Sequence, residues 1–217
     1  MPRHKEALQH RFTRVRVMGH DDFAPVHPLL ASRWSPTRFD PRHEVPPSAV
    51  ESLLEAARWA PSAGNSQPWA FIVGRRGDST HRRIVGHLAG SSAAWAAEAS
   101  LLAVNLSHRW VEGTDWEYSE FSLYDLGQAV AHMTVQAQAL GISSRQFRAF
   151  DRQGLADEFG VPGHWEVTTM TAFGVAVPEG GPGATPGSEA RMNVHMPTVP
   201  PSRRRRPLEE LLWPVTS

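Results

Sequence analysis

Residues 123–140 carry the most regular pattern in the chain and restrict its possible folds more than any other segment. Apolar residues recur there at alternating intervals of three and four, the period of one face of an α-helix; they are Leu123, Leu126, Val130, Met133, Ala137 and Leu140. Gly and Ala fill much of the remaining surface. A helix of this kind is expected in a crowded interior or in an interface.

Short apolar runs predict strands on either side of further helices. Residues 69–73 (WAFIV) have the length of a buried strand. The unbroken apolar run at 101–106 (LLAVNL) favours a sheet that is covered on both faces. Two further strands are expected at 142–147 and 167–177.

A second amphipathic helix is predicted from Ser48 to the residue before Pro61. Ser48 and Glu51 have the spacing of a capping box, and the apolar residues that follow have the helical period. Shorter helices are expected at 22–32, before Leu88, at 93–99, and from a capping Asp151 to Gly160. Strands interleaved with helices indicate the α/β or the α+β class.

Size and composition fit one folded domain. With 217 residues, of which 41% are hydrophobic and 20% charged, the chain has enough apolar material for a core. We expect a leader over residues 1–21, a single domain over 22–217 and, from about residue 178, an irregular arm rich in Gly and Pro. The leader lacks the apolar segment of a secretory signal, and no segment is apolar enough to span a bilayer, so a cytoplasmic location is predicted.

Charge and residue types argue against several functions. Lys and Arg together number 22, as do Asp and Glu, so no overall field attracts nucleic acid or an anionic membrane. The absence of Cys excludes disulfides, thiolate metal sites and cysteine nucleophiles. Because the eleven His are scattered without an HExxH pattern, we expect no metal site. Rossmann, P-loop and GxSxG motifs are also absent.

Two segments carry donors that suit a phosphate group. Arg33, Ser35 and Arg38 lie within SRWSPTRF, and guanidinium and hydroxyl groups bind a dianion well. Near the other end of the chain, Arg203–Arg206 precede PLEELL, a helix start that could hold them against a phosphate. The first segment also suits a solvated basic loop, and the second a solvated tail or a nucleic-acid patch.

Two further segments suit a flat ligand. In PSAGNSQPW (61–69), small residues allow close backbone approach, while Asn65 and Gln67 each offer a donor and an acceptor. In SSRQFRAFD (143–151), Gln146–Ala149 could place backbone N–H groups and one cation beside a redox-active ring. The alternatives are an ordinary helix-to-strand turn and an exposed strand end.

A polar segment at 107–121 carries several aromatic residues. They are Trp110, Trp116, Tyr118 and Phe121. We interpret the segment as an excursion from the domain whose aromatic side chains either plug the core or roof a cleft.

In this order, four segments resemble the nitroreductase family of FMN-dependent oxidoreductases: SRWSPTRFD, VESLLEAARWAPSAGNSQPWAFIV, SLYDLGQAVAHMTVQAQALGI and RRRRPLEELL. The most specific part is AARWAPSAGNSQPW. The resemblance implies an α+β fold with a mixed, mainly antiparallel sheet flanked by helices and an extended C-terminal arm. It also implies a homodimer with two FMN sites where the subunits meet.

The cofactor-binding residues follow from the same resemblance. The phosphate clamp would consist of Arg33, Trp34 (mainly through its backbone), Ser35, Arg203 and Arg205. The loop that reaches the flavin from the partner subunit would contribute Pro61, Ser62, Ala63, Asn65 and Gln67. The strand end facing the ring would be Gln146, Phe147, Arg148 and Ala149. Many members carry Pro or Trp and then an acidic residue or Gly there, so Arg148 would add a cation that stabilises reduced flavin and favours an acidic acceptor.

The implied activity is transfer of hydride from NAD(P)H to a small electrophilic acceptor, such as a nitroaromatic or a quinone, by a ping-pong mechanism. Because the chemistry takes place on FMN N5, no catalytic side chain is expected. The aromatic residues at 110–121 would line the acceptor site. The alternatives are a non-catalytic flavin-binding or flavin-sequestering protein of this fold, a relative with another flavin reaction, and a protein that binds nucleic acid through its arginine run.

Overall fold

The computed structural model describes residues 26–177 and 205–213, which belong to two units. The larger unit begins at Pro28, and its elements are α1 (Pro28–Ser32), α2 (Pro47–Arg58), the 3-10 turn η1 (Ala63–Asn65), β1 (Trp69–Arg75), α3 (Ser79–Val85), α4 (Gly90–Ala96), β2 (Leu101–His108), α5 (Ser122–Ala139), β3 (Ser143–Phe147), α6 (Arg152–Phe159) and β4 (Trp165–Gly174). Residues 205–213 belong to the smaller unit and contain the 3-10 helix η2 (Leu208–Leu211).

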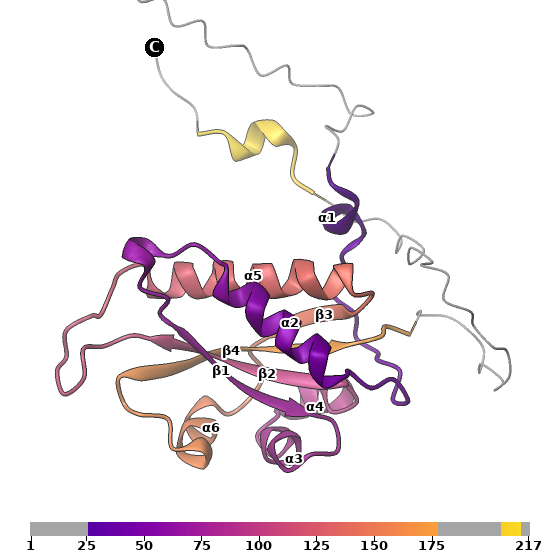
Figure 1. The fold of residues 1–217 in the computed structure, drawn as a ribbon, viewed down its shortest axis with the longest axis horizontal. Coiled ribbons are helices and arrows are strands. Elements are labelled where there is room, and N and C mark those ends of the chain that lie inside the picture. Colours follow the sequence, from indigo (N-terminus) through magenta and orange to yellow (C-terminus); the bar gives the residue numbers. More distant parts are fainter. Residues whose placement is uncertain (1–25, 178–204, 214–217) are drawn as a thin grey trace, which may run out of the picture. The chain divides into compact units, whose positions relative to one another are not determined.

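The four strands form one sheet in the order β1-β2-β4-β3. All three neighbouring pairs are antiparallel. Together with the flanking helices, this sheet confirms the expected α+β class (Figure 1). In the central strand β2, every residue from Leu101 to Ser107 is buried, as its apolar run predicts.

Helices cover both faces of the sheet (Figure 1). On one face, α2 and α5 pack over Leu101 and Ala103. On the other face, α3, α4 and α6 surround a second apolar cluster that includes Leu102 and Val104. The two clusters are separate because successive side chains of a strand point to opposite faces. The long helix α5 thus lies on the sheet.

The predicted long helix is confirmed as α5, and the helix predicted at 48–60 as α2. The proposed cap of α2 is wrong, however, because the helix begins at Pro47, its N-cap is Pro46 and no side chain caps it. Proline suits the first turn of a helix, where its fixed φ is favourable and no N–H is needed. The helix therefore begins one residue before Ser48.

The remaining elements differ from the expectation mainly at their ends. The strands β1, β2 and β4 extend to Arg75, to His108 and back to Trp165. Asp151 caps α6 as predicted, since its side chain accepts the N–H of Gly154 at 2.9 Å. Of the helix expected at 22–32, only Pro28–Ser32 is helical among the described residues. PLEELL forms the short 3-10 helix η2 instead of an α-helix.

Candidate functional site

The segment after α1 lies beside the C-terminal half of α5 and the edge strand β3. Arg33 Nη1 donates to Ser35 Oγ at 3.2 Å, so these two predicted phosphate ligands are adjacent. Arg145 of β3 donates through Nη1 to the carbonyl of Ser35 at 3.2 Å. Gln138 of α5 donates to Ser32 Oγ at 3.2 Å. The buried Trp34 Nε1 has no hydrogen-bond partner among the described residues.

The end of β3 places the second group of predicted residues next to this segment. Gln146 is exposed, and its Nε2 lies 3.5 Å from Thr134 Oγ1 of α5. Phe147 is half-buried and points to the other face of the sheet, where its ring packs edge-on against Trp95 with 4.8 Å between ring centroids. Arg148 is exposed and donates through Nε to the Thr168 carbonyl at 3.3 Å. Ala149 is exposed, and its carbonyl accepts the N–H of Ala89.

The loop between α2 and β1 has an unusual backbone. Gly64, Asn65 and Gln67 all have positive φ, at 58°, 56° and 48°. This conformation is uncommon for Asn and rarer for a residue such as Gln. The Gln67 N–H donates to Ser62 Oγ at 3.0 Å, which closes the loop. The side chains of four predicted ligands are exposed: Pro61, Ala63, Asn65 and Gln67.

This loop lies at the N-terminal end of α5, far from residues 33–35 and 146–149 of the same chain (Figure 1). The Ala63 N–H donates to Asp125 Oδ2 at 3.1 Å. The other group contacts Thr134 and Gln138. At about 1.5 Å per residue, nine to thirteen helical residues separate the two anchor points by about 14 to 20 Å. One chain therefore brings 33–35 and 146–149 together and leaves the 61–67 loop apart.

The aromatic excursion after β2 forms a hairpin closed by a bridge between Trp110 and Glu117. Tyr118 stacks on His108 with 3.8 Å between ring centroids, and Trp165 stacks at 4.9 Å. Burial lowers the pKa of the His108 imidazole, and the adjacent His164 acts in the same direction. By contrast, Trp116 and Phe121 are 76% and 47% exposed. The four predicted acceptor residues thus lie in one segment but in different environments.

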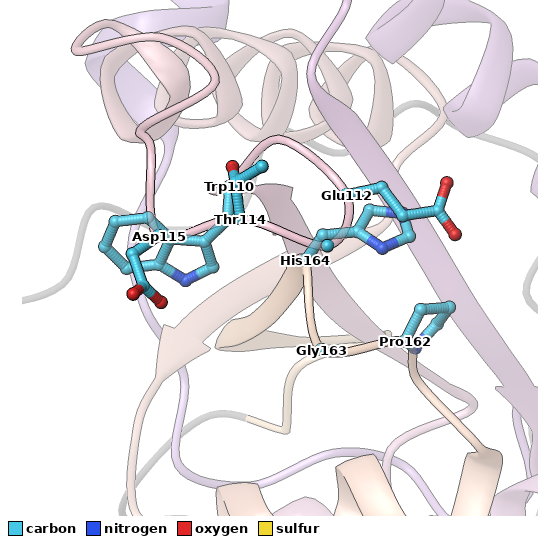
Figure 2. A pocket seen from close by; sticks show the side chains of 8 residues that line it. Trp110, Glu112, Thr114, Asp115, Pro162, Gly163 and His164 are labelled. Atoms are coloured by element: carbon cyan, nitrogen blue, oxygen red, sulfur yellow. The ribbon is translucent and has the colours of Figure 1, made fainter.

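A pocket of about 550 Å³ lies between the hairpin tip and the turn before β4 (Figure 2). It is lined by Trp110, Glu112, Gly113, Thr114, Asp115, Pro162, Gly163 and His164. The backbone N–H groups of Arg109 and Trp110 both donate to the His164 carbonyl, which joins the two walls. Of the four predicted acceptor residues, only Trp110 lines this pocket.

Comparison with known proteins decides the family. The family model described as "Nitroreductase family" matches residues 30–175, which is more than half of the chain. The chain belongs to the nitroreductase family. The match covers 33–35, the 61–67 loop, α5 and 146–149 of this nitroreductase family member, but not its arginine run.

Individual relatives agree with this assignment. A provisionally named NADH dehydrogenase/NAD(P)H nitroreductase of Methanothermobacter thermautotrophicus is 26% identical over 83% of this chain and 89% of its own length. A solved structure described as an oxidoreductase containing FMN is 28% identical, with a TM-score of 0.67 over 72% of this chain and 80% of that chain. A nitroreductase family protein of Clostridium difficile 630 shares the fold, with 22% identity and a TM-score of 0.63 over 88% of this chain and 98% of that chain.

The two predicted phosphate ligands near the C-terminus of this nitroreductase family member are Arg203 and Arg205. Arg205 is exposed and precedes η2, whereas Arg203 lies outside the described residues. Within residues 26–177 and 205–213, no cluster of His, Cys, Asp and Glu could hold a metal ion. Over the same ranges, no helix has the length and apolar character needed to cross a membrane.

Sequence reasoning missed Asp125. This residue is only 2% exposed, and its side chain accepts a hydrogen bond from the backbone of the 61–67 loop. The available signal was a single acidic side chain within a helix that is otherwise rich in small and apolar residues. Its partner is a backbone N–H 62 residues earlier, which no local pattern indicates.

Proposed function

We propose that this nitroreductase family member binds FMN and passes hydride from NAD(P)H to a small electrophilic acceptor, such as a nitroaromatic or a quinone. The observation that carries the proposal is the division of one ligand set between the two ends of α5. The relatives support it, because one is described as containing FMN and another as an NAD(P)H nitroreductase.

The donor set fits a phosphorylated flavin. The adjacent guanidinium of Arg33 and hydroxyl of Ser35 match the needs of a phosphate group. We propose that the Trp34 backbone, Arg203 and Arg205 complete the clamp. The exposed side chains of Asn65 and Gln67 each offer a donor and an acceptor, which suits a ring edge with alternating carbonyl and N–H groups.

We propose a homodimer in which each flavin lies between subunits. The 61–67 loop would reach the flavin held by 33–35 and 146–149 of the partner subunit, since one chain keeps these groups apart. Exposed apolar side chains near this loop support an interface: Trp59, Tyr124 and Leu123 are 72%, 68% and 43% exposed. Large exposed apolar groups of this kind mark interaction surfaces.

When bound, FMN supplies the hydride chemistry, so the protein's residues need only bind the cofactor, orient its ring and exclude water. The clamp would fix the phosphate, and the 61–67 loop would orient the ring. Arg148 would add positive charge near the ring and favour acceptors that carry an acidic group. The open face would receive the nicotinamide first and the acceptor after it has left, which gives ping-pong kinetics. Trp110, Trp116, Tyr118 and Phe121 would form the acceptor side of the site.

The visible spectrum of the purified protein tests this function, followed by anaerobic mixing with NADH and with NADPH. We expect a yellow dimer whose flavin absorbance bleaches with at least one nicotinamide and returns on addition of a quinone. A yellow protein that neither nicotinamide reduces would instead be a flavin-binding protein without this activity. A colourless protein that does not bind added FMN contradicts the proposal. The cytoplasmic location remains a prediction from the sequence.

A further inference from the structure

Asp125 is a buried carboxylate in the first turn of α5. It is 2% exposed, and its Oδ2 accepts the Ala63 N–H at 3.1 Å. Among the described residues, no Lys or Arg forms an ion pair with it. The helix N-terminus favours a negative charge at this position. Burial of an unpaired carboxylate is nevertheless costly, so its one strong contact is important for keeping it in place.

The contact of Asp125 falls where the loop enters its unusual conformation. Ala63 opens η1, and the residues that follow it, Gly64 and Asn65, are left-handed, as is Gln67. Such conformations persist only where the surroundings impose them. Two side-chain acceptors add to the backbone bonds of the turn: Asp125 accepts the N–H of Ala63 at the beginning of the loop, and Ser62 Oγ accepts the N–H of Gln67 at its end. The side chains of Asn65 and Gln67 are exposed, and Gln67 Nε2 also donates to the Asn65 carbonyl at 3.3 Å.

We infer that Asp125 is a positioning residue for flavin binding: its carboxylate, fixed in α5, holds the 62–67 loop in the conformation that presents Asn65 and Gln67 to the flavin. The inference rests on the proposed FMN site. Asp125 would act without touching the cofactor, because it connects the 62–67 loop of its own subunit to the long helix α5. Because α5 packs on the sheet, the bond to Asp125 sets the position of the loop relative to the sheet (Figure 1).

Two variants break this bond from opposite sides. Asp125→Ala removes the acceptor. Ala63→Pro removes the donor at the first position of a 3-10 turn, where proline is tolerated. The preceding Ser62 has φ −147° and ψ 154°, an extended conformation compatible with a following proline. Asp125→Asn keeps an oxygen that can accept the Ala63 N–H. Ser122→Ala is the matched control, because Ser122 is buried in the same turn but bonds to the Ser119 carbonyl.

FMN affinity and amide hydrogen exchange of residues 62–67 without FMN are measured for each variant. We expect Asp125→Ala and Ala63→Pro each to weaken FMN binding roughly tenfold or more and to speed exchange in the loop. The double variant should bind FMN no more weakly than either single variant, because each single variant already removes the same hydrogen bond. Asp125→Asn should restore most of the affinity, and Ser122→Ala should change neither quantity.

The outcomes separate this inference from the proposed function. Additive losses in the double variant, or loop exchange in Asp125→Ala equal to that in Ser122→Ala, overturn the role of Asp125 while FMN binding stands. A wild-type protein that does not bind FMN contradicts the proposed function and removes the ligand from the inference. The exchange rates then still decide whether Asp125 orders the loop.

Discussion

At the scale of single residues, the left-handed backbone of Gln67 lowers the stability of the fold, whereas its side chain has a proposed role in FMN binding. A left-handed conformation costs a residue with a side chain about 1 to 2 kcal/mol, and glycine avoids this cost. We expect Gln67→Gly to raise the free energy of unfolding by about 0.5 to 1 kcal/mol, because relief of this cost is only partly offset by the extra freedom of glycine in the unfolded chain. The same change should weaken FMN binding, since it removes the polar contact that we propose between Gln67 and the flavin ring. Denaturant unfolding and FMN titration measure the two effects.

Asn65→Gly is the comparison for this prediction. Asn tolerates the left-handed region better than Gln, so its replacement should give a smaller gain in stability with a similar loss of affinity. Equal or reduced stability of Gln67→Gly would show that the loop backbone is not strained at this residue.

The proposed clamp makes a second prediction at the residue scale. A charge-assisted hydrogen bond contributes about 1.5 to 3 kcal/mol, so Arg205→Ala should weaken FMN binding by roughly one to two orders of magnitude. Arg206→Ala, at the neighbouring exposed position, should leave the affinity nearly unchanged. Fluorescence titration of FMN compares the two variants, and similar affinities for both would remove Arg205 from the clamp.

At the scale of elements, His108 in the ring stack at the base of the hairpin and two other histidines make the stability of the fold decline at acidic pH. Burial lowers the pKa of His43, His81 and His108 below the ordinary value of 6.5. The folded state therefore binds fewer protons than the unfolded chain as the pH falls through this region. The contribution of these three histidines to stability is therefore fully present above pH 6.5 and is lost as the pH falls below it. Carboxylates with lowered pKa, such as Glu55 at about 2, lose their contributions only at more acidic pH.

Replacing His108 tests this contribution. His108→Phe keeps a flat ring between Tyr118 and Trp165, so we expect a smaller loss of stability between pH 7 and pH 5 than in the wild type. Because His43 and His81 remain, the slope should fall without vanishing. Urea unfolding at several pH values provides the slope, and an unchanged slope would show that His108 does not contribute to it.

The outer part of the same excursion makes a separate prediction about acceptors. Trp116 and Phe121 are exposed and carry little of the packing, so Trp116→Ala and Phe121→Ala should alter acceptor preference and leave FMN affinity nearly intact. Ratios of kcat/KM for a nitroaromatic and a quinone measure the preference. Loss of FMN from either variant would mean that the side chain has a structural role instead.

At the scale of the whole molecule, the sequence predicts elements better than the contacts between them. The apolar periods of α2 and α5 and the runs of β1 and β2 locate these elements within a few residues. The cap at Ser48 failed because an adjacent proline determines where the helix starts. The sheet order and the contact between Ala63 and Asp125 join residues far apart in the chain, and local patterns do not encode such pairs.

We propose that residues of two chains complete each flavin site, and a mixed dimer tests this arrangement most directly. One subunit carries Arg33→Ala and the other carries Asn65→Ala with Gln67→Ala, with different tags to isolate the mixed species. If the loop contacts the flavin held by the partner subunit, one site contains all the substitutions and the other site contains none. We therefore expect one FMN bound per mixed dimer with wild-type affinity, although neither homodimer binds tightly. A mixed dimer without any wild-type site would contradict the shared site, because each chain would then bind flavin with its own loop.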